Sequence, residues 1–234
     1  MDLAATATMH FMASESPPIR IVAFDIYDTL ASWPSGRVQP IDVQRLLGRF
    51  GIDISYQAYE AARQATFFFD CPKREITGWM DFLALLFARM EVMVSMDLLA
   101  CVAAEYESRS NMDILPGAVP TLQSVKAAGF ITCGFTTLPR FMLGRRGHEI
   151  LSHLDHYFDA SRVGVAKGAR QFYERITAAL GVPPSQILAV GDDPLCDVQL
   201  PIEAGWRAVL LDNRATASGD GVIHSLDELK RFIS

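Results

Sequence analysis

The chain has 234 residues, of which 50% are hydrophobic and 21% charged, a composition typical of a globular protein and not of a disordered one. It carries 21 Lys and Arg against 27 Asp and Glu, a formal net charge of −6 at pH 7. It has no block of basic residues, which argues against a general nucleic-acid or anionic-membrane binder.

A short leader, residues 1–18, is expected to be flexible, and Met9 and Met12 leave the position of the start codon open. The leader has no basic start and no long apolar stretch, so it does not have the features of a secretory signal. The most apolar segment, residues 82–104, is interrupted by three charged residues, which excludes a membrane span. The four cysteines form no CxxC pair, which favours a reducing cytoplasm.

The first regular element is expected at residues 19–24, IRIVAF, an apolar and β-branched run that predicts a buried parallel strand. A polar cluster that includes Asp25 and Asp28 follows it directly. Residues 33–113 then change character, with helical periodicity and little strand signal, and predict a helical block inserted between strands. Its expected helices lie around residues 41–50, 56–66, 77–90 and 96–108.

Strands and helices alternate in the rest of the chain. The expected strands are 130–135, 187–190 and 208–211, and the expected helices are 118–128, 140–153, 171–180 and 226–233. Such alternation indicates a parallel sheet with helices on both faces. The sequence therefore predicts an α/β fold, with a Rossmann-like core formed by residues 19–32 and 114–234 and an α-helical cap domain formed by residues 33–113.

Polar side chains stand at or just after the ends of these strands, where parallel sheets bind ligands. Asp25 and Thr136 each follow a strand, Lys167 precedes a helix, and Asp192 and Asp197 follow a third strand. Clustered carboxylates repel one another unless a cation lies among them. Magnesium prefers oxygen ligands and commonly bridges carboxylates to a substrate phosphate. The cluster therefore predicts a Mg²⁺ site that faces a phosphoryl group, with Lys167 neutralising the remaining charge.

Four motifs occur in a fixed order: FDIYDTL at 24–30, GFTT at 134–137, GVAKGARQFY at 164–173 and VGDDPLCD at 190–197. On an alternating sheet they resemble the motifs of the haloacid dehalogenase (HAD)-like hydrolase superfamily, from about residue 19 to the C-terminus. The helical insertion directly after the first motif is similar to the cap of the branch that contains small-molecule phosphatases and 2-haloacid dehalogenases.

The resemblance implies that Asp25 is a nucleophile that forms a covalent aspartyl intermediate, which splits a difficult displacement into two easier steps. It also implies that the Asp25 carboxylate, the Tyr27 main-chain carbonyl and Asp192 ligate Mg²⁺. Asp197 would support the metal or Lys167.

The resemblance further implies that Thr136 hydrogen-bonds a transferring oxygen, and that Thr136, Thr137 and Lys167 bind the substrate. Phosphoryl transfer then depends mostly on positioning and on charge neutralisation. The expected substrate is a small molecule, a phosphate ester.

One residue departs from the phosphatase pattern. Family phosphatases usually carry a second Asp two residues after the nucleophile, and this chain has Tyr27 there. Tyrosine ordinarily has a pKa of about 10 and is a poor general base near neutrality. A halide leaving group needs no proton, and the 2-haloacid dehalogenases of the family do place a tyrosine here. A metal-independent 2-haloacid dehalogenase is therefore the alternative, and a non-catalytic binding protein is the third hypothesis.

The acids at Asp192 and Asp197 favour the phosphatase, because the dehalogenases dispense with magnesium and usually lack them. Asp28 replaces the usual glycine, and Asp tolerates the unusual backbone angles that glycine allows. As a hypothesis, Asp28 is a catalytic residue that supplies the missing acid–base function. Strand alternation, however, puts Asp25 and Tyr27 on one side and Asp28 on the other.

Three further features have two interpretations each. The aromatic residues at 67–69 and Trp79 are expected in the core of the helical block, with the lining of a substrate pocket as the alternative. Tyr173 matches a tyrosine that the dehalogenases of the family also have, but aromatic packing on a helix explains it equally well. Asp193 is expected to be an exposed loop acid, with a group that supports the site residues from behind as the alternative.

Overall fold

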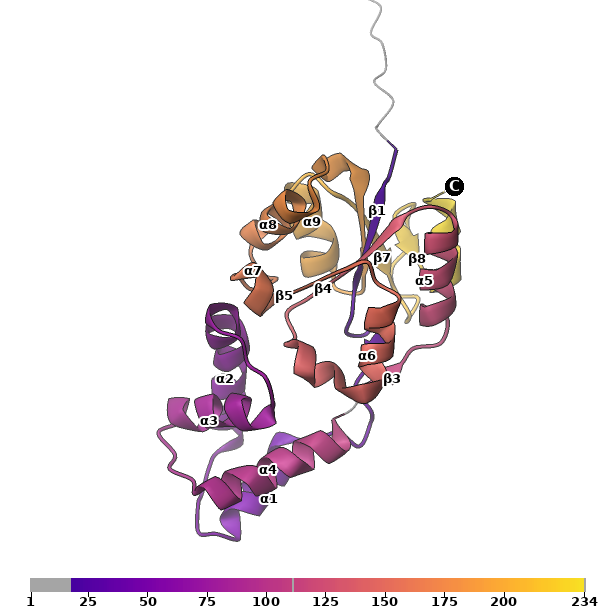
Figure 1. Cartoon of the computed structure of the whole chain (residues 1–234). Helices are drawn as coiled ribbons and strands as arrows, with labels where there is room; N and C mark the ends of the chain where they lie inside the picture. Colours follow the sequence, from indigo (N-terminus) through magenta and orange to yellow (C-terminus); the bar gives the residue numbers. More distant parts are fainter. Residues whose placement is uncertain (1–17, 111, 234) are drawn as a thin grey trace, which may run out of the picture.

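The computed structural model describes residues 18–110 and 112–233, so residues 1–17 of the expected leader lie outside the described part (Figure 1). Its core is a six-stranded, all-parallel sheet in the order β5-β4-β1-β6-β7-β8. The strands are β1 (Ile21–Asp25), β4 (Ile131–Thr136), β5 (His156–Asp159), β6 (Ile187–Gly191), β7 (Arg207–Leu211) and β8 (Val222–Ile223). The predicted α/β class with a parallel, Rossmann-like sheet is confirmed.

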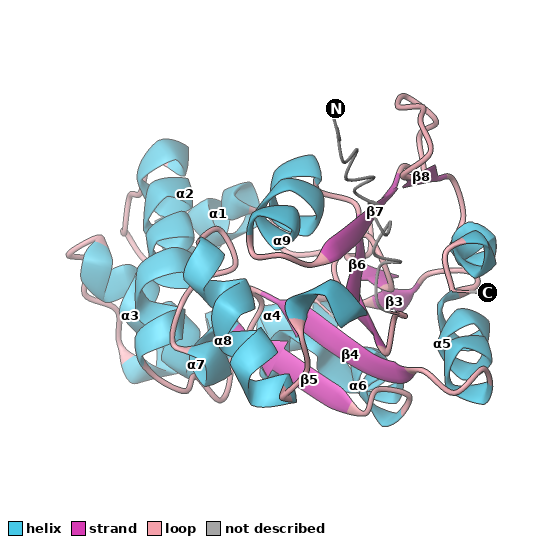
Figure 2. Ribbon diagram, turned by 90° about the horizontal axis from the view of Figure 1, so that it is seen from above, coloured by secondary structure: helices cyan, strands magenta, loops and turns pink. Residues whose placement is uncertain are grey.

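Helices cover both faces of this sheet (Figure 2). Val22 and Phe24 of β1 pack into one apolar cluster together with Leu122, whereas Ile21 and Ala23 pack into another cluster on the opposite face. Every residue of β1 is buried, which explains its unbroken apolar run. The helices around the sheet are α5 (Ala118–Ala127), α6 (Gly144–Ser152), α7 (Ala160–Val163), α8 (Arg170–Leu180) and α9 (Leu200–Glu203).

A separate helical block follows β1, and we call residues 33–110 the helical insertion. It has an apolar cluster of its own, in which Leu47, Tyr59 and Leu83 are completely buried. Ser55 and Ser95 begin two of its helices, and each side chain accepts a hydrogen bond from a backbone N–H of the first turn. The helices are α1 (Pro40–Gly48), α2 (Tyr56–Ala65), α3 (Trp79–Arg89) and α4 (Met96–Arg109), with a π-helical turn at Thr66–Asp70.

The chain leaves and re-enters the sheet domain through a short antiparallel ribbon. It is formed by β2 (Ala31–Ser32) and β3 (Asp113–Ile114). Trp33 and Leu138 each pack against both the cluster of the helical insertion and the cluster around α5. The two apolar cores are therefore distinct but share these two side chains.

Most predicted elements lie within two residues of the observed ones, but two predicted helices differ, and the short elements β2, β3, β5, β8, α7 and α9 were not predicted. The helix predicted over 140–153 is divided into a 3₁₀ turn (Arg140–Leu143) and α6, because Gly144 has a φ of 58° that interrupts the helix. The helix predicted at 226–233 is a 3₁₀ helix, Leu226–Arg231. Strand β5 was not predicted, because its four residues are too few to show alternation. Among the described residues, no helix has the length and apolar character that crossing a bilayer requires.

Candidate active site

The predicted polar residues converge at one edge of the sheet. The parallel register pairs Phe24 of β1 with Val190 of β6, so Asp25 ends its strand beside the residues that lead to Asp192. Asp197 lies in the π-helical turn Pro194–Gln199 that follows β6. Lys167 lies between α7 and α8. Three segments that are remote in sequence thus form one site.

Lys167 is the centre of this site. Its Nζ donates a short hydrogen bond to Asp25 Oδ1 and lies 2.6 Å from Asp197 Oδ1. The contact between Lys167 Nζ and Asp197 Oδ1 is an ion pair that lacks hydrogen-bond geometry. Asp197 Oδ1 is therefore a buried oxygen that accepts no hydrogen bond. The ammonium also lies 4.8 Å from the centroid of the Phe135 ring. Asp25, Lys167 and Asp197 are all buried, so their charges act with little screening by water.

Three carboxylates lie close together beside this ammonium, since Asp25, Asp192 and Asp197 have carboxylate oxygens within 4.8 Å of one another. Burial raises the pKa of Asp25 above its ordinary value; Lys167 opposes this rise, and the charge of Asp197 adds to it. Burial, followed by the charge of Asp197, raises the pKa of Asp192 to about 6. Burial alone would lower the pKa of Lys167, but the charges of Asp25 and Asp197 outweigh it and raise that pKa. The cluster therefore lacks positive charge, and its oxygen donors suit a hard divalent cation such as Mg²⁺.

Two residues hold the acids and the lysine in place. The backbone N–H of Asp193 donates to Asp197 Oδ2 (3.0 Å), and Asp193 Oδ1 accepts from the N–H groups of Leu195 and Cys196. The buried Tyr173 hydroxyl lies between two carbonyl oxygens, that of Lys167 at 2.9 Å and that of Cys196. Tyr173 thus connects the loop that carries Lys167 to the turn that carries Asp197.

For Asp193 a supporting role was the less favoured interpretation of the sequence, and the role of the Tyr173 hydroxyl was not predicted. The Asp193-Pro194 pair is a helix-start signal that could have indicated the first. No sequence signal separates the Tyr173 hydroxyl contact from ordinary packing. The exposure expected for Asp193 is correct.

Gly191 permits the close approach of Asp197. A Cβ atom at position 191 would overlap the Asp197 carboxyl group and lie 2.6 Å from its Cβ.

We expect Gly191→Ala to lower the free energy of unfolding by about 1–3 kcal/mol, the usual cost of overpacking, and to weaken Mg²⁺ binding. Urea unfolding and isothermal titration measure the two effects. Gly168→Ala is the control, because a Cβ there meets nothing within 4 Å; equal effects of the two substitutions would contradict the prediction.

Asp28 and Thr29 lie beside the cluster. Asp28 has a φ of 58°, which confirms that an Asp occupies a position with left-handed backbone. Its charge contributes to the raised pKa of Asp192. The buried Thr29 hydroxyl donates to Asp192 Oδ1 at 3.4 Å, a contact that the sequence did not indicate. The acid–base role of Asp28 stays a hypothesis.

Thr136 and Thr137 lie at the end of β4, next to β1. Thr136 is buried, and its Oγ1 accepts a hydrogen bond of 3.2 Å from the Leu138 N–H, which leaves the hydroxyl proton for another acceptor. Thr137 is half-buried and lines a cavity. Thr136 is therefore enclosed at the end of the strand, whereas Thr137 faces the cavity.

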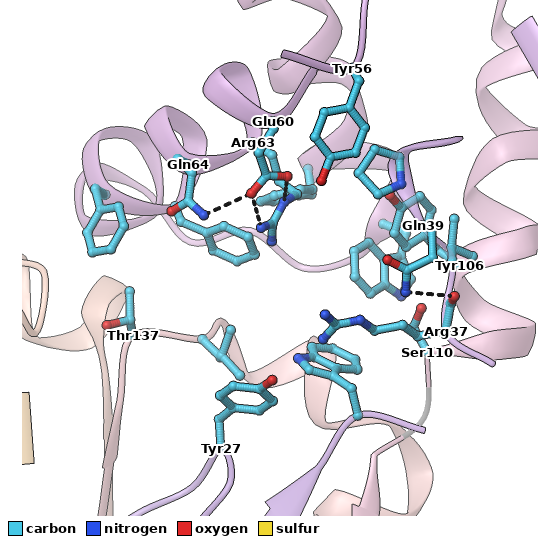
Figure 3. A pocket seen from close by; sticks show the side chains of 18 of the residues that line it. Tyr27, Arg37, Gln39, Tyr56, Glu60, Arg63, Gln64, Tyr106, Ser110 and Thr137 are labelled. Carbon is cyan, nitrogen blue, oxygen red and sulfur yellow. Dashed lines mark hydrogen bonds and ion pairs between the residues drawn. The ribbon is translucent and has the colours of Figure 1, made fainter. Parts of the chain in front are cut away.

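This space, which we call the interface cavity, has a volume of about 610 Å³ and lies between the helical insertion and the sheet edge. Figure 3 shows Tyr27 and Thr137 on one side and Tyr56, Glu60, Arg63 and Gln64 on the other. The aromatic residues at 67–69 and Trp79 were expected either in the helical core or in the wall of a pocket. Phe67 and Trp79 are buried in the helical core and also line the cavity. Phe68 lines the cavity as well, and Phe69 is exposed.

The site thus combines a buried aspartate and a buried lysine at the edge of a parallel α/β sheet, next to a helical insertion. Residues 19–205, most of the chain, match the family model of haloacid dehalogenase-like hydrolases. The chain belongs to this family.

Three individual relatives are informative. The chain is 32% identical over 123 residues to enolase-phosphatase E1 of Enterobacter sp. (strain 638), a match that covers 50% of this chain and 52% of the relative, so the chain spans about half the length of that protein. The structure of 2-haloacid dehalogenase from Pseudomonas syringae pv. Tomato DC3000 matches with a TM-score of 0.68 at 20% identity, over 92% of this chain and 98% of that one. A HAD phosphatase from Thermococcus onnurineus matches with a TM-score of 0.63 at 18% identity, over 91% and 97%. At these identities the structural matches show the fold alone.

Proposed function

We propose that the protein is a Mg²⁺-dependent phosphatase of a small phosphorylated metabolite. The observation that carries this proposal is the cluster of Asp25, Asp192 and Asp197 beside the ammonium of Lys167. Three carboxylates this close are costly in a buried site unless a cation joins them. A metal-independent dehalogenase needs no metal ligands, so it does not account for the close spacing of all three carboxylates.

In the proposed reaction the Asp25 carboxylate attacks phosphorus, the bond from phosphorus to the leaving oxygen breaks, and an aspartyl phosphate forms. Water then attacks this phosphorus and releases inorganic phosphate and the Asp25 carboxylate. Lys167 and the Thr136 hydroxyl bind oxygens of the phosphoryl group, and Thr137 contacts the substrate from the cavity. Each of these groups acts by position and charge.

The residues that would hold Mg²⁺ are Asp25, Asp192 and the main-chain carbonyl of Tyr27, with Asp197 supporting the metal or Lys167. When bound, the ion would neutralise charge on the phosphoryl oxygens. Residues 33–113 are proposed as a cap over the core of residues 19–32 and 114–234, because the interface cavity lies between them. Free thiols on all four cysteines fit a cytoplasmic location.

Tyr27 supports the second candidate, a metal-independent 2-haloacid dehalogenase, because its side chain faces the interface cavity where an acid would serve a phosphatase (Figure 3). A non-catalytic binding protein is the third candidate. The three differ in which product they release and in whether they need a metal.

A panel of phosphate esters and 2-haloacids, each assayed with Mg²⁺ and with EDTA, separates these candidates. We expect inorganic phosphate from at least one ester, and a rate at least about tenfold lower in EDTA, because the uncompensated carboxylates then oppose an anionic substrate. Chloride release that EDTA leaves unchanged would establish the dehalogenase instead. Binding of Mg²⁺ without turnover of any compound would favour the non-catalytic protein.

A further inference from the structure

The guanidinium of Arg37 is a cation at the interface cavity that has no anionic partner among the described residues. Arg37 lines the cavity and is half-buried. Its side chain makes no hydrogen bond and no ion pair with any other described residue. A guanidinium offers five N–H donors in one plane, and withdrawing such a group from water is costly without an acceptor. This end of the cavity therefore has donors and charge to offer to a ligand.

The other charged residues in the described lining do not neutralise Arg37. Glu60 accepts two hydrogen bonds from Arg63 and one from Gln64. The hydrogen bond from Arg63 is the first cause of the lowered pKa of Glu60, and the charge of Arg37 is the last of the named causes. Asp193 follows β6 and accepts two backbone N–H groups of its own turn. Two arginines against one glutamate thus leave the insertion side of the described lining with one positive charge in excess.

The backbone that carries Arg37 is held in place on both sides. Arg109 Nε donates to the Gly36 carbonyl at 2.9 Å, and the Arg37 N–H donates to the Pro34 carbonyl at 3.0 Å. The Arg37 carbonyl accepts a hydrogen bond of 3.3 Å from Gln39 Nε2. Figure 3 shows that the Arg37 side chain extends into the cavity. A donor on a fixed backbone loses less conformational freedom when it binds an anion.

The remaining wall of the cavity suits a flat, apolar body. Trp33, Phe67, Trp79 and Phe82 line it, and so does Phe68, whose side chain is 43% exposed. Aromatic side chains contact flat rings favourably through their faces and edges. The volume of about 610 Å³ falls in the range of small-molecule sites. A ring in this space would cover apolar surface that is otherwise exposed to water.

We propose that the interface cavity is a binding site for an aromatic carboxylate, whose carboxylate group pairs with Arg37 and whose ring lies against the aromatic wall. A carboxylate matches the planar fork of a guanidinium with two parallel hydrogen bonds. Its single negative charge also balances the single excess charge of the insertion side. Asp25 and Lys167 are not among the described lining residues, so this ligand is held by residues other than the nucleophile and its lysine. The inference goes beyond the proposed phosphatase function, because binding in the cavity requires neither a metal ion nor turnover.

Benzoate and benzamide form a matched pair of probes, because they share the ring and differ in the charge of one planar group. Trp33 and Trp79 line the cavity, so quenching of tryptophan fluorescence reports its occupancy. The third tryptophan, Trp206, is buried in an apolar cluster of the sheet. In EDTA, we expect the wild-type protein to bind benzoate at least about tenfold more tightly than benzamide, the effect of one charge-assisted hydrogen bond.

Arg37→Gln should bind the two probes about equally, because the amide keeps polarity at this position but has no charge. Arg49→Gln is the matched control, since Arg49 is an exposed residue at the C-terminal end of α1 that does not line the cavity. It should keep the wild-type preference for benzoate. Far-UV circular dichroism shows whether each variant is folded, and Arg37→Met takes the place of Arg37→Gln if the latter does not fold.

Three results would overturn this proposal. One is equal affinity of the wild-type protein for the two probes. Another is a benzoate preference that Arg37→Gln leaves unchanged, because the anion would then bind elsewhere. The third is a preference that Arg49→Gln lowers as much as Arg37→Gln does, because it would then reflect the overall charge of the protein. The phosphatase is tested separately by the ester panel: benzoate binding at Arg37 without phosphate release from any ester would support this site and contradict the phosphatase.

Discussion

Asp25→Asn is expected to lower kcat for phosphate release by about 10⁴-fold or more, because an amide oxygen cannot form the covalent aspartyl phosphate. The substitution keeps the size of the side chain and removes one negative charge from a buried cluster that has too many. The folded structure should therefore be retained, and the variant should melt no earlier than wild type in EDTA. Phosphate release under saturating substrate and thermal unfolding measure the two effects.

Asp97→Asn is the matched control, because this exposed residue in the first turn of α4 lies outside the site. It should retain wild-type activity. Wild-type kcat in Asp25→Asn would show that another group is the nucleophile, and loss of activity accompanied by unfolding would show a structural role only.

Lys167→Met is expected to lower kcat/KM by about 10²–10³-fold, because it removes the ammonium that is proposed to bind phosphoryl oxygens. It should also destabilise the metal-free protein by about 3–5 kcal/mol, because removing one partner of a buried ion pair leaves charge without compensation. Here the uncompensated groups are Asp25 and Asp197. Added Mg²⁺ should recover part of the stability but not the activity, and urea unfolding with and without Mg²⁺ tests this.

Lys126→Met is the comparison for this variant. Lys126 pairs with Asp155 at 2.7 Å, but both side chains are more than a third exposed. A surface pair contributes only about 0–1 kcal/mol, so this variant should unfold near the wild-type midpoint and keep its activity. Equal destabilisation by the two substitutions would contradict the buried, charge-balancing position of Lys167.

The strand ends were predictable from the sequence because β1 and β6 are apolar runs that stop just before acidic residues, and the largely apolar β4 stops at two threonines. That rule located Asp25, Thr136 and Asp192 before any geometry was available. Lys167 required the family motif as well, since it lies in a loop between two helices. Its contact with Asp25 joins residues that are 142 positions apart in the sequence. Local sequence patterns do not predict contacts between residues so widely separated.

The contacts that hold the site in place were not predictable in the same way. The Tyr173 hydroxyl and the Thr29 hydroxyl act through tertiary neighbours, and a buried tyrosine on a helix gives the same sequence pattern in either role. The division of the predicted helix near Gly144 depends on one backbone angle. The lining of the interface cavity depends on how the helical insertion meets the sheet edge, which periodicity within each helix does not specify.

Trp33 and Leu138 bridge the two apolar cores, and this sharing constrains how the parts of the molecule can move. Leu138 directly follows Thr137, and its N–H is bonded to Thr136 Oγ1. A rotation of the helical insertion away from the sheet would pull on the loop that presents both threonines. We therefore expect that opening the cavity would also displace the hydroxyls that are proposed to bind the phosphoryl group, so that substrate entry and catalysis would require different positions of this loop.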